Sequence, residues 1–554
     1  MRWILLVFLA LAGCDDAPTQ AVVDATPTLD GAVGPDAALD PDAALEPEPD
    51  GAPDAAPEPD AAPDAAPETT ASLEWRACPQ LAGQRNALVE CAERVVPLRR
   101  DVPEAGDISL FVKRIRPDDA DGRSLWILAG GPGQAGDELE GLGAVLAAAE
   151  PRLTIYLPDH RGTGRSTRLS CPEAEAPGSP GGAAITDAEW PGCHREVLAV
   201  YGEAEHLVGF GTTEAAHDLA ELIDASGEGT PYVLGVSYGT FLAWRYLQVA
   251  PNQAAGVIFD SACHPSVCHL SAQDLWEDGV GRAWFDEVCG QDATCAEKLG
   301  PVPSAAVQSL HDALQAGHCP LLGEDPVQAR ATLRAVLGQM LFFANLRPAL
   351  PAFVYRLARC SPEDQQAIVH MFDALFGGPG GGGSGSYSWP LAMNILVSEM
   401  WEPSNPTPAE LDARYENTLM CRGVSALVAH QAPAWTRYSE PLTHQPLVTE
   451  LPTLILQAEY DPATPVAVAE PMAAALDGPH QRFVVVPNAS HSVVAQSVMA
   501  DNLQQHCGTL LLQAFLADPT GPLPDCTGGT LPPRFPGRGP YNMAVFGTED
   551  LWEN

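Results

Sequence analysis

The chain has 554 residues, of which 46% are hydrophobic and 7% aromatic, with 50 glycines and 53 prolines. This length allows two or three domains, or one domain with a long insertion, and the proline and glycine content indicates that part of the chain lies outside a packed core. The formal net charge of −43 excludes nucleic acid as an expected partner, because nucleic-acid binding requires a basic surface.

Residues 1–13 are predicted to be an export signal, in which Arg2 precedes an apolar run too short to span a bilayer. The run ends at Leu11 to Cys14, which resembles the lipobox of bacterial lipoproteins, where the cysteine is lipidated and begins the mature chain. An ordinary secretory signal with a chance cysteine is the alternative. The resemblance implies an exported lipoprotein, held at a membrane through lipid on Cys14, in the periplasm or at the cell surface.

Residues 14–70 are predicted to be a disordered acidic tether. From Ala17 to Thr70 the chain repeats units such as PDAA and PEPD, with 13 Asp or Glu, no Lys or Arg and no aromatic residue. Such a segment cannot bury enough apolar surface to offset the entropy of ordering it. We therefore expect a spacer between the membrane and a folded body.

The body alternates short apolar runs with helical stretches. Buried strands are predicted within 124–136, 153–166, 231–239, 254–262, 453–461 and 482–491, and helices at 213–226, 467–476 and 493–515. This alternation predicts an α/β fold with a mostly parallel sheet covered by helices on both faces. Residues 265–445 are largely helical and proline-rich, and we interpret them as a cap inserted between two parts of the core, 71–264 and 446–554.

A possible nucleophile lies in the stretch LGVSYGTF, where Gly235 to Gly239 spell G-x-S-x-G around Ser237. The motif is common by chance, and a structural serine at a glycine turn is the alternative. Here it directly follows a buried strand and precedes a helical stretch, which is the context of a nucleophile elbow. The context favours Ser237 as a catalytic nucleophile.

A serine nucleophile needs a base and an orienting acid, which follow in the order Ser, acid, His in the α/β-hydrolase fold. His491 lies just after a predicted strand and fits the base, and Asp461 ends the strand before it and fits the acid. Asp260, at the end of the strand that follows the elbow helix, is the rival acid. His217 and His370 lie in helical surroundings that are typical of surface or packed histidines.

Backbone N–H groups can supply an oxyanion hole. One is expected from Tyr238, the residue after the nucleophile, and the other from Gly131 in the glycine-rich loop GGPG. A simple turn is the alternative interpretation of that loop. No metal or cofactor is expected.

The motifs GGPGQAG, DHRGTGRS, GVSYGTFLA, PTLILQAEYDPATP and SHS together resemble the secreted prolyl and tripeptidyl aminopeptidase branch of the α/β-hydrolases, peptidase family S33, with a TAP-like C-terminal part. The resemblance covers nearly all of residues 73–526. It implies a Ser-Asp-His triad at Ser237, Asp461 and His491, an acyl-enzyme route and peptide substrates with a free N-terminus. A carboxylesterase and a catalytically silent peptide-binding lipoprotein are the alternatives.

Two positions depart from the family pattern. Ala129 stands where proline iminopeptidases usually have His, and His160 replaces a common Gln. Neither change removes a backbone donor, so hydrolysis is expected, but proline specificity is not implied. In the cap, NILVSEMWEP resembles a family segment V-x-C-x-E, which places Glu399 on a substrate-amine-binding glutamate and Val397 on a cysteine. A solvated surface glutamate is the alternative.

Fourteen cysteines in an exported chain predict disulfides rather than metal ligands. A zinc site at 263–269 (CHPSVCH) is the less favoured alternative to a disulfide or mere proximity there. Without Cys14 the number is odd, so at least one thiol is free or intermolecular, and Cys421 is a candidate. Sequence cannot fix the connectivity, but short separations favour Cys78–Cys91, Cys171–Cys193, Cys289–Cys295 and Cys507–Cys526.

Overall fold

The structure is a computed structural model, and it describes residues 72–78, 87–376, 387–535 and 537–553. The predicted signal, the tether and the lipidation site at Cys14 lie outside the described residues. Over the described ranges, no helix is both long enough and apolar enough to cross a membrane.

The core is a sheet with the strand order β1-β2-β3-β5-β4-β6-β7-β8-β9. The pairs from β5–β4 to β8–β9 are parallel, and β1, β2 and β3 pair antiparallel at one edge. The predicted mostly parallel sheet is therefore confirmed, and the antiparallel edge was not foreseen. The strands are β1 (Arg76–Ala77), β2 (Ala87–Pro97), β3 (Asp107–Pro117), β4 (Arg123–Leu128), β5 (Thr154–Asp159), β6 (Thr230–Val236), β7 (Gly256–Asp260), β8 (Thr453–Ala458) and β9 (Gln481–Val486).

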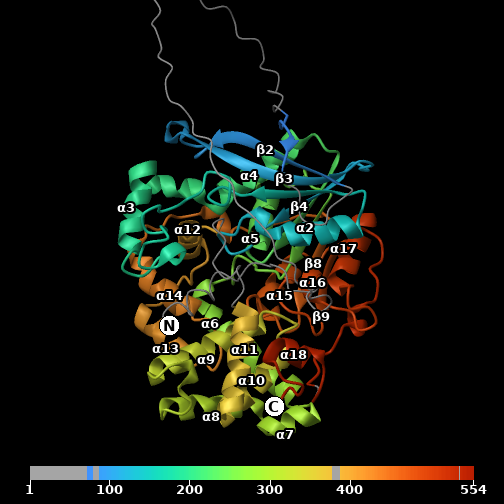
Figure 1. Cartoon of the computed structure of the whole chain (residues 1–554). Helices are drawn as coiled ribbons and strands as arrows, with labels where there is room; N and C mark the ends of the chain where they lie inside the picture. The colour runs from blue at the N-terminus through green and yellow to red at the C-terminus, as the bar shows by residue number, and fades with distance from the viewer. Residues whose placement is uncertain (1–71, 79–86, 377–386, 536, 554) are drawn as a thin grey trace, which may run out of the picture. The chain divides into compact units, whose positions relative to one another are not determined.

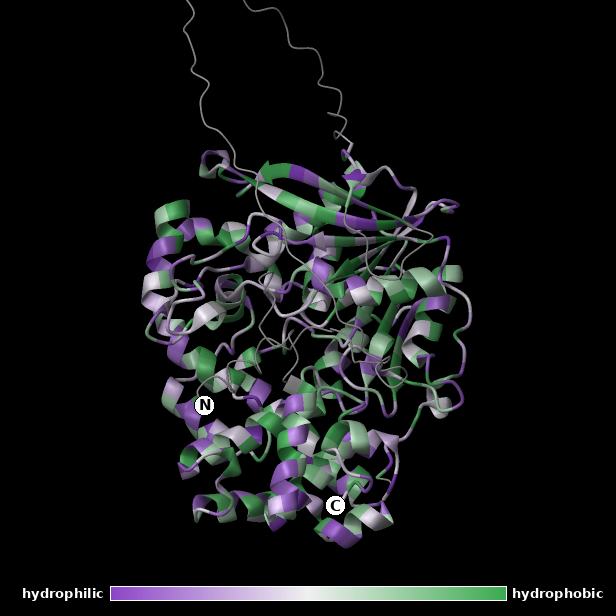
Figure 2. Ribbon diagram, viewed as in Figure 1, coloured by the Kyte–Doolittle hydropathy of each residue, from purple (hydrophilic) through white to green (hydrophobic). Residues whose placement is uncertain are grey.

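Helices cover both faces of the sheet. Successive side chains of a strand point to opposite faces, and apolar side chains on both faces must be buried. In β4, Leu125 and Ile127 belong to the cluster that α2 and α17 complete, whereas Trp126 and Leu128 belong to the cluster that contains α4, α5 and α15. Figure 2 shows hydrophobic residues along the strands, and helices that carry both hydrophobic and hydrophilic residues. The core helices are α2 (Glu140–Ala149), α3 (Trp190–Tyr201), α4 (Thr212–Ser226), α5 (Tyr238–Val249), α15 (Val466–Ala475), α16 (Val493–Gln496) and α17 (Cys507–Ala517).

The prediction of a single helix at 493–515 is wrong, because the structure has α16 and α17 with a loop between them. Ser497 explains the break. Its hydroxyl donates to the carbonyl of Val493 (2.6 Å) and accepts from the N–H of Gly508 (2.8 Å), so it binds backbone groups on both sides of the loop. Asn502 then forms a turn, accepting from the backbone N–H of Gln504 and Gln505.

The chain between β7 and β8 forms the helical cap, most of which lies below the sheet in Figure 1, with α12 beside the sheet. A second hydrophobic cluster, with Trp284, Leu337 and Phe353 fully buried, is separate from the clusters on the sheet. The cap helices are α6 (Gln273–Ala283), α7 (Ala293–Leu299), α8 (Pro303–Gln315), α9 (Pro326–Leu341), α10 (Leu350–Arg359), α11 (Pro362–Phe376), α12 (Trp389–Glu399), α13 (Pro408–Glu416) and α14 (Val424–Gln431).

The C-terminal segment returns to the cap, whereas residues 446–554 were expected to belong to the core. Helix α18 (Pro540–Phe546) lies beside α11 (Figure 1), and Phe546 and Trp552 are buried in the cap cluster. Arg356 of α10 holds this segment through hydrogen bonds to the carbonyls of Leu551 (3.0 Å) and Glu553 (2.7 Å).

Candidate active site

Ser237 lies between the end of β6 and the start of α5, with backbone angles φ 57° and ψ −123°. A non-glycine residue at positive φ is strained, which is typical of a nucleophile elbow. The flanking glycines allow the close approach of strand and helix. A Cβ on Gly235 would lie 2.2 Å from the carbonyl oxygen of Gly239, and a Cβ on Gly239 would lie 2.2 Å from that of Leu128.

His491 and Asp461 are hydrogen-bonded to each other. The Nδ1 of His491 lies 2.9 and 3.0 Å from the two carboxylate oxygens of Asp461. Burial alone would raise the pKa of Asp461, but His491 and donors that include the N–H of Thr464 outweigh it, so this pKa is below its usual value. Because Nδ1 faces the carboxylate, Nε2 of His491 is the nitrogen left to act as a base.

Asp260, the rival acid, is hydrogen-bonded to the histidine loop rather than to His491. Its two oxygens accept from the backbone N–H groups of Val493 (2.6 Å) and Val494 (2.9 Å). Burial raises its pKa to about 6. The structure thus places Asp461 against the imidazole and Asp260 at the start of the helix that follows it.

Ser237 and His491 line one cavity of about 50 Å³ at the junction of core and cap. Gly131 and Tyr238, the two predicted oxyanion-hole residues, line the same cavity. Tyr238 is the first residue of α5, so its N–H has no acceptor within the helix. The five residues predicted for catalysis are therefore brought together, although they lie up to 360 positions apart along the chain.

The cap holds the glycine loop that carries Gly131. The hydroxyl of Tyr387 donates to the carbonyl of Pro132 (2.8 Å), and the N–H of Ser388 donates to that of Gly133 (2.8 Å). A Cβ on Gly130 would lie 3.0 Å from the Cβ of Ser237, so the loop packs directly against the elbow. The start of α12 thus fixes one side of the cavity.

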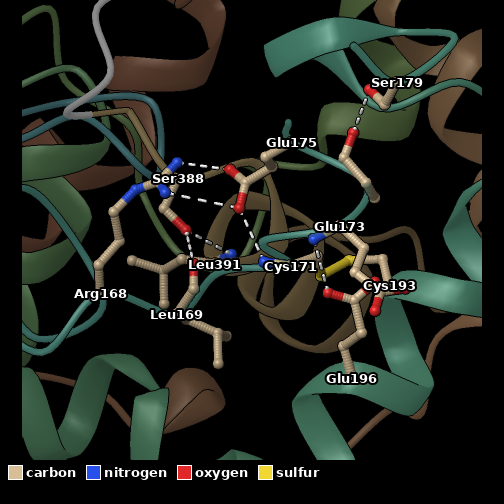
Figure 3. Close-up of a disulfide and its surroundings, with 11 residues drawn as sticks. Arg168, Leu169, Cys171, Glu173, Glu175, Ser179, Cys193, Glu196, Ser388 and Leu391 are labelled. Carbon is tan, nitrogen blue, oxygen red and sulfur yellow. Dashed lines mark hydrogen bonds and ion pairs between the residues drawn. A yellow bond between two sulfur atoms is a disulfide. The ribbon is translucent and has the colours of Figure 1, made fainter. Parts of the chain in front are cut away.

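A disulfide between Cys171 and Cys193 lies close to this contact between core and cap (Figure 3). Next to it, Glu175 accepts from the backbone N–H of Cys171 (2.7 Å) and pairs with Arg168, which also donates to the carbonyl of Tyr387. Ser388 donates to the carbonyl of Leu169 and accepts from the N–H of Leu391 (3.1 Å), which caps α12. Core loop 168–175 and cap helix α12 are therefore connected by side chains.

The structure contains the four expected disulfides and two more, Cys263–Cys268 and Cys319–Cys360. The pair at 263–268 occupies both cysteines of the alternative zinc site. Within the described ranges, no group of three or more His, Cys, Asp or Glu side chains is placed to hold a metal ion. Cys421 is a free, buried thiol, as expected for the odd cysteine.

Glu399 contacts other protein groups and does not line the cavity. Its Oε1 accepts from the N–H of Thr212 (2.9 Å) and from the hydroxyl of Tyr438 (2.5 Å), and its Oε2 lies 3.8 Å from Arg245. Burial raises the pKa of Glu399. The cavity wall includes the next residue, Met400, but not Glu399. Glu399 is buried rather than a solvated surface side chain, and its amine-binding role stays a prediction.

His160, one of the two departures from the family pattern, is buried beside Tyr238. Its ring centroid lies 5.9 Å from that of Tyr238, and its Nδ1 lies 3.2 Å from the carbonyl oxygen of Arg161. Burial lowers the pKa of His160 to about 4. The ring is therefore neutral near pH 7 and packs as an aromatic side chain.

Arg347 is a buried residue of the site that was not predicted from the sequence. It lies at the start of the short helix η8 (Arg347–Ala349) and donates to the carbonyls of Leu341 (2.9 Å) and Ala489 (2.8 Å), the carbonyl of Tyr460 and the hydroxyl of Ser490 (2.8 Å). Tyr460 precedes Asp461, and Ser490 precedes His491. One cap side chain thus connects the two loops that carry Asp461 and His491. No sequence motif marks it.

Two family models match the chain. The model described as the α/β hydrolase fold matches residues 124–284, and the one described as TAP-like protein matches residues 412–527. The first match contains β4 to β7 with the elbow, and the second contains the acid and histidine loops.

Curated relatives match over long stretches. Serine protease Hip1 of Mycobacterium tuberculosis is 23% identical over 469 residues, which is 76% of this chain and 86% of the relative. Tripeptidyl aminopeptidase of Streptomyces lividans is 28% identical over 250 residues, 40% of this chain and 45% of the relative. Among solved structures, proline iminopeptidase of Mycobacterium smegmatis is 18% identical, with a TM-score of 0.32, 73% of this chain and 92% of that chain covered.

Proposed function

Since the chain belongs to the α/β-hydrolases, in the branch with a TAP-like C-terminal part, we propose that it is a serine peptidase that uses Ser237, His491 and Asp461 as a catalytic triad. The observation that carries this proposal is the cavity that Ser237 and His491 line together, with Asp461 hydrogen-bonded to the far side of the imidazole. Its relatives' names support an aminopeptidase that removes short N-terminal units from peptides.

The proposed reaction proceeds through an acyl-enzyme. Ser237 Oγ attacks the scissile carbonyl carbon while Nε2 of His491 takes its proton, and the N–H groups of Gly131 and Tyr238 stabilise the oxyanion. His491 returns the proton to the leaving amine, and a water molecule then hydrolyses the ester by the same steps. Asp461 holds the imidazole by its Nδ1 and stabilises the imidazolium.

A substrate panel tests the proposed activity. Aminoacyl, dipeptidyl and tripeptidyl amides are compared with their N-acetylated forms and with simple esters, using wild-type protein and Ser237→Ala. We expect hydrolysis of peptidyl amides with a free amine and none by Ser237→Ala. Hydrolysis of esters alone would reject the peptidase and support an esterase, and absence of any turnover would support a silent binding protein.

The same panel tests the amine-binding role of Glu399. If Oε2 of Glu399 receives the substrate ammonium, Glu399→Gln lowers kcat/KM for free-amine substrates much more than for N-acetylated ones, because only the former lose an ion pair. Glu440→Gln is the matched control, since Glu440 also lies beside Arg245 (3.5 Å). Equal losses on both kinds of substrate would exclude Glu399 from amine binding.

A further inference from the structure

Arg422 is the charged side chain of the cavity that the proposed mechanism does not use. It follows Cys421 in the cap, its side chain is 4% exposed, and it lines the cavity with Ser237 and His491. Its guanidinium lies 3.7 Å from the centre of the Phe342 ring, and that ring lies 5.8 Å from the ring of His491. The Phe342 ring thus contacts both the Arg422 cation and the imidazole of the proposed base, His491.

Glu277 of α6 fixes the orientation of this guanidinium. Its Oε1 accepts from Nε (2.9 Å) and Nη2 (2.8 Å) of Arg422, and its Oε2 accepts from the backbone N–H of Arg422 (2.6 Å). Gln273 adds a further donor to Oε1 (2.9 Å). In the described part of the chain, Nη1 of Arg422 has no hydrogen-bond acceptor, so its donors are available to a group that enters the cavity.

The charges of the cavity favour one class of acyl group. No Asp or Glu is among the described residues that line it, and Arg422 and His491 are the two lining residues able to carry a positive charge. An ammonium placed here would meet a cation and no carboxylate, which is unfavourable in a partly dry site. A carboxylate would receive charge-assisted hydrogen bonds from Nη1.

We propose that Arg422 is a specificity-determining residue that selects substrates whose acyl residue, the one next to the scissile bond, carries a side-chain carboxylate. This inference rests on the proposed function, because it assigns the acyl subsite of the same serine peptidase. Glu277 acts through Arg422 as a positioning residue, since its carboxylate is hydrogen-bonded to the guanidinium.

The test compares Ala-Ala-Xaa amides of 7-amino-4-methylcoumarin with Glu, Gln, Ala and Lys at Xaa. For wild-type protein we expect kcat/KM to fall in the order Glu, Gln, Ala, Lys, with Glu preferred to Ala by roughly tenfold or more, as for one charge-assisted hydrogen bond. In Arg422→Gln combined with Glu277→Gln, which removes both buried charges together, the ratio of Glu to Ala should fall to about one.

Two further variants keep the test decisive. Arg422→Lys retains the charge beside Glu277 but lacks the Nη1 donors, so it should weaken the preference for Glu over Ala even if the double variant does not fold. Arg334→Gln is the control, because Arg334 is a buried arginine that donates to the carbonyls of Thr418 (2.9 Å) and Glu416 (2.8 Å) without lining the cavity. It should keep the wild-type ratio.

The outcomes separate this inference from the function on which it rests. Covalent labelling of Ser237 by a fluorophosphonate together with equal cleavage of the Glu and Lys substrates would overturn the role of Arg422 alone. A preference for Glu that survives in both Arg422 variants would also overturn it. Absence of labelling and of turnover on all four substrates would overturn the proposed peptidase, and the subsite with it.

Discussion

Two buried aspartates lie near His491, and their hydrogen bonds distinguish their roles. Asp461 contacts Nδ1 of the imidazole, and Asp260 contacts the backbone of Val493 and Val494. An aspartate after either strand is compatible with the order of the motifs, so sequence alone could favour Asp461 but could not show what Asp260 does. The hydrogen bonds assign orientation of the base to Asp461 and placement of its loop to Asp260.

Asparagine at each position gives a matched comparison. We expect Asp461→Asn to lower kcat roughly 10³- to 10⁴-fold, because an amide does not stabilise the imidazolium and can hold the wrong tautomer. Asp260→Asn should instead lower the free energy of unfolding by about 1–3 kcal/mol, because one of two buried backbone donors loses its acceptor. Steady-state kinetics and urea unfolding measure the two effects. The reverse pattern would make Asp260 the catalytic acid.

At the scale of elements, the cap both covers the cavity and binds the loops that carry the proposed catalytic residues. The segment between α9 and η8 is bound to the histidine loop by Arg347 and also by Gln496, which donates to the carbonyls of Phe342 (3.1 Å) and His491 (2.6 Å). On the opposite side, Tyr387 and Ser388 hold the glycine loop. The positions of the proposed triad residues therefore depend on helices that the sequence assigns to a separate insertion.

Arg347→Lys tests this dependence, and Arg356→Lys is its control. Both arginines are buried in the cap and donate to several backbone carbonyls, but the carbonyls that Arg356 contacts lie in the C-terminal segment, and its carboxylate partner Asp364 lies in α11. We expect both variants to lose stability, and only Arg347→Lys to lose kcat, by roughly 100-fold, because it displaces both catalytic loops. The measurement is kcat per active site titrated with a fluorophosphonate. Equal kcat values would show that Arg347 contributes to stability alone.

Sequence patterns predicted the parallel strands and the elbow because these depend on local features, such as apolar runs and a strand-turn-helix around Ser237. They could not predict Arg347 or Arg422, whose partners lie far away in the sequence and whose neighbours form no motif. Helix 493–515 was predicted as continuous because its apolar spacing continues, whereas the tertiary contacts of Ser497 interrupt it. Sequence patterns do not reveal side-chain hydrogen bonds to distant parts of the chain, and these bonds determine all three features.

At the scale of the whole molecule, the body remains acidic without its leader. After residues 1–70, with Arg2 and 15 acids, are set aside, 57 Asp or Glu stand against 28 Lys or Arg. The body and the tether are therefore both acidic, and neither is expected to bind an anionic membrane surface by charge. If the protein is held at a membrane, its charge does not supply the attachment, and the proposed lipidation of Cys14 would have to do so.

The lipid anchor is tested by changing that cysteine. We propose that the mature protein begins at a lipidated Cys14 and sediments with membranes, because acyl chains supply the apolar surface that the acidic tether lacks. Cys14→Ala should leave the protein soluble with its peptidase activity unchanged. The readout is the intact mass of the purified mature protein, which shows whether its N-terminal residue is lipidated. A mass for an unmodified residue at position 14 would favour an ordinary secretory signal.

The nucleophilic role of Ser237 is the central claim, and covalent labelling tests it most directly. Wild-type protein is treated with a fluorophosphonate and digested, and the modified residue is located by mass spectrometry. We predict one adduct, on Ser237, that is lost in Ser237→Ala and formed much more slowly in His491→Gln, because the serine is activated by that imidazole. Labelling of another serine, or an unchanged rate in His491→Gln, would contradict the account.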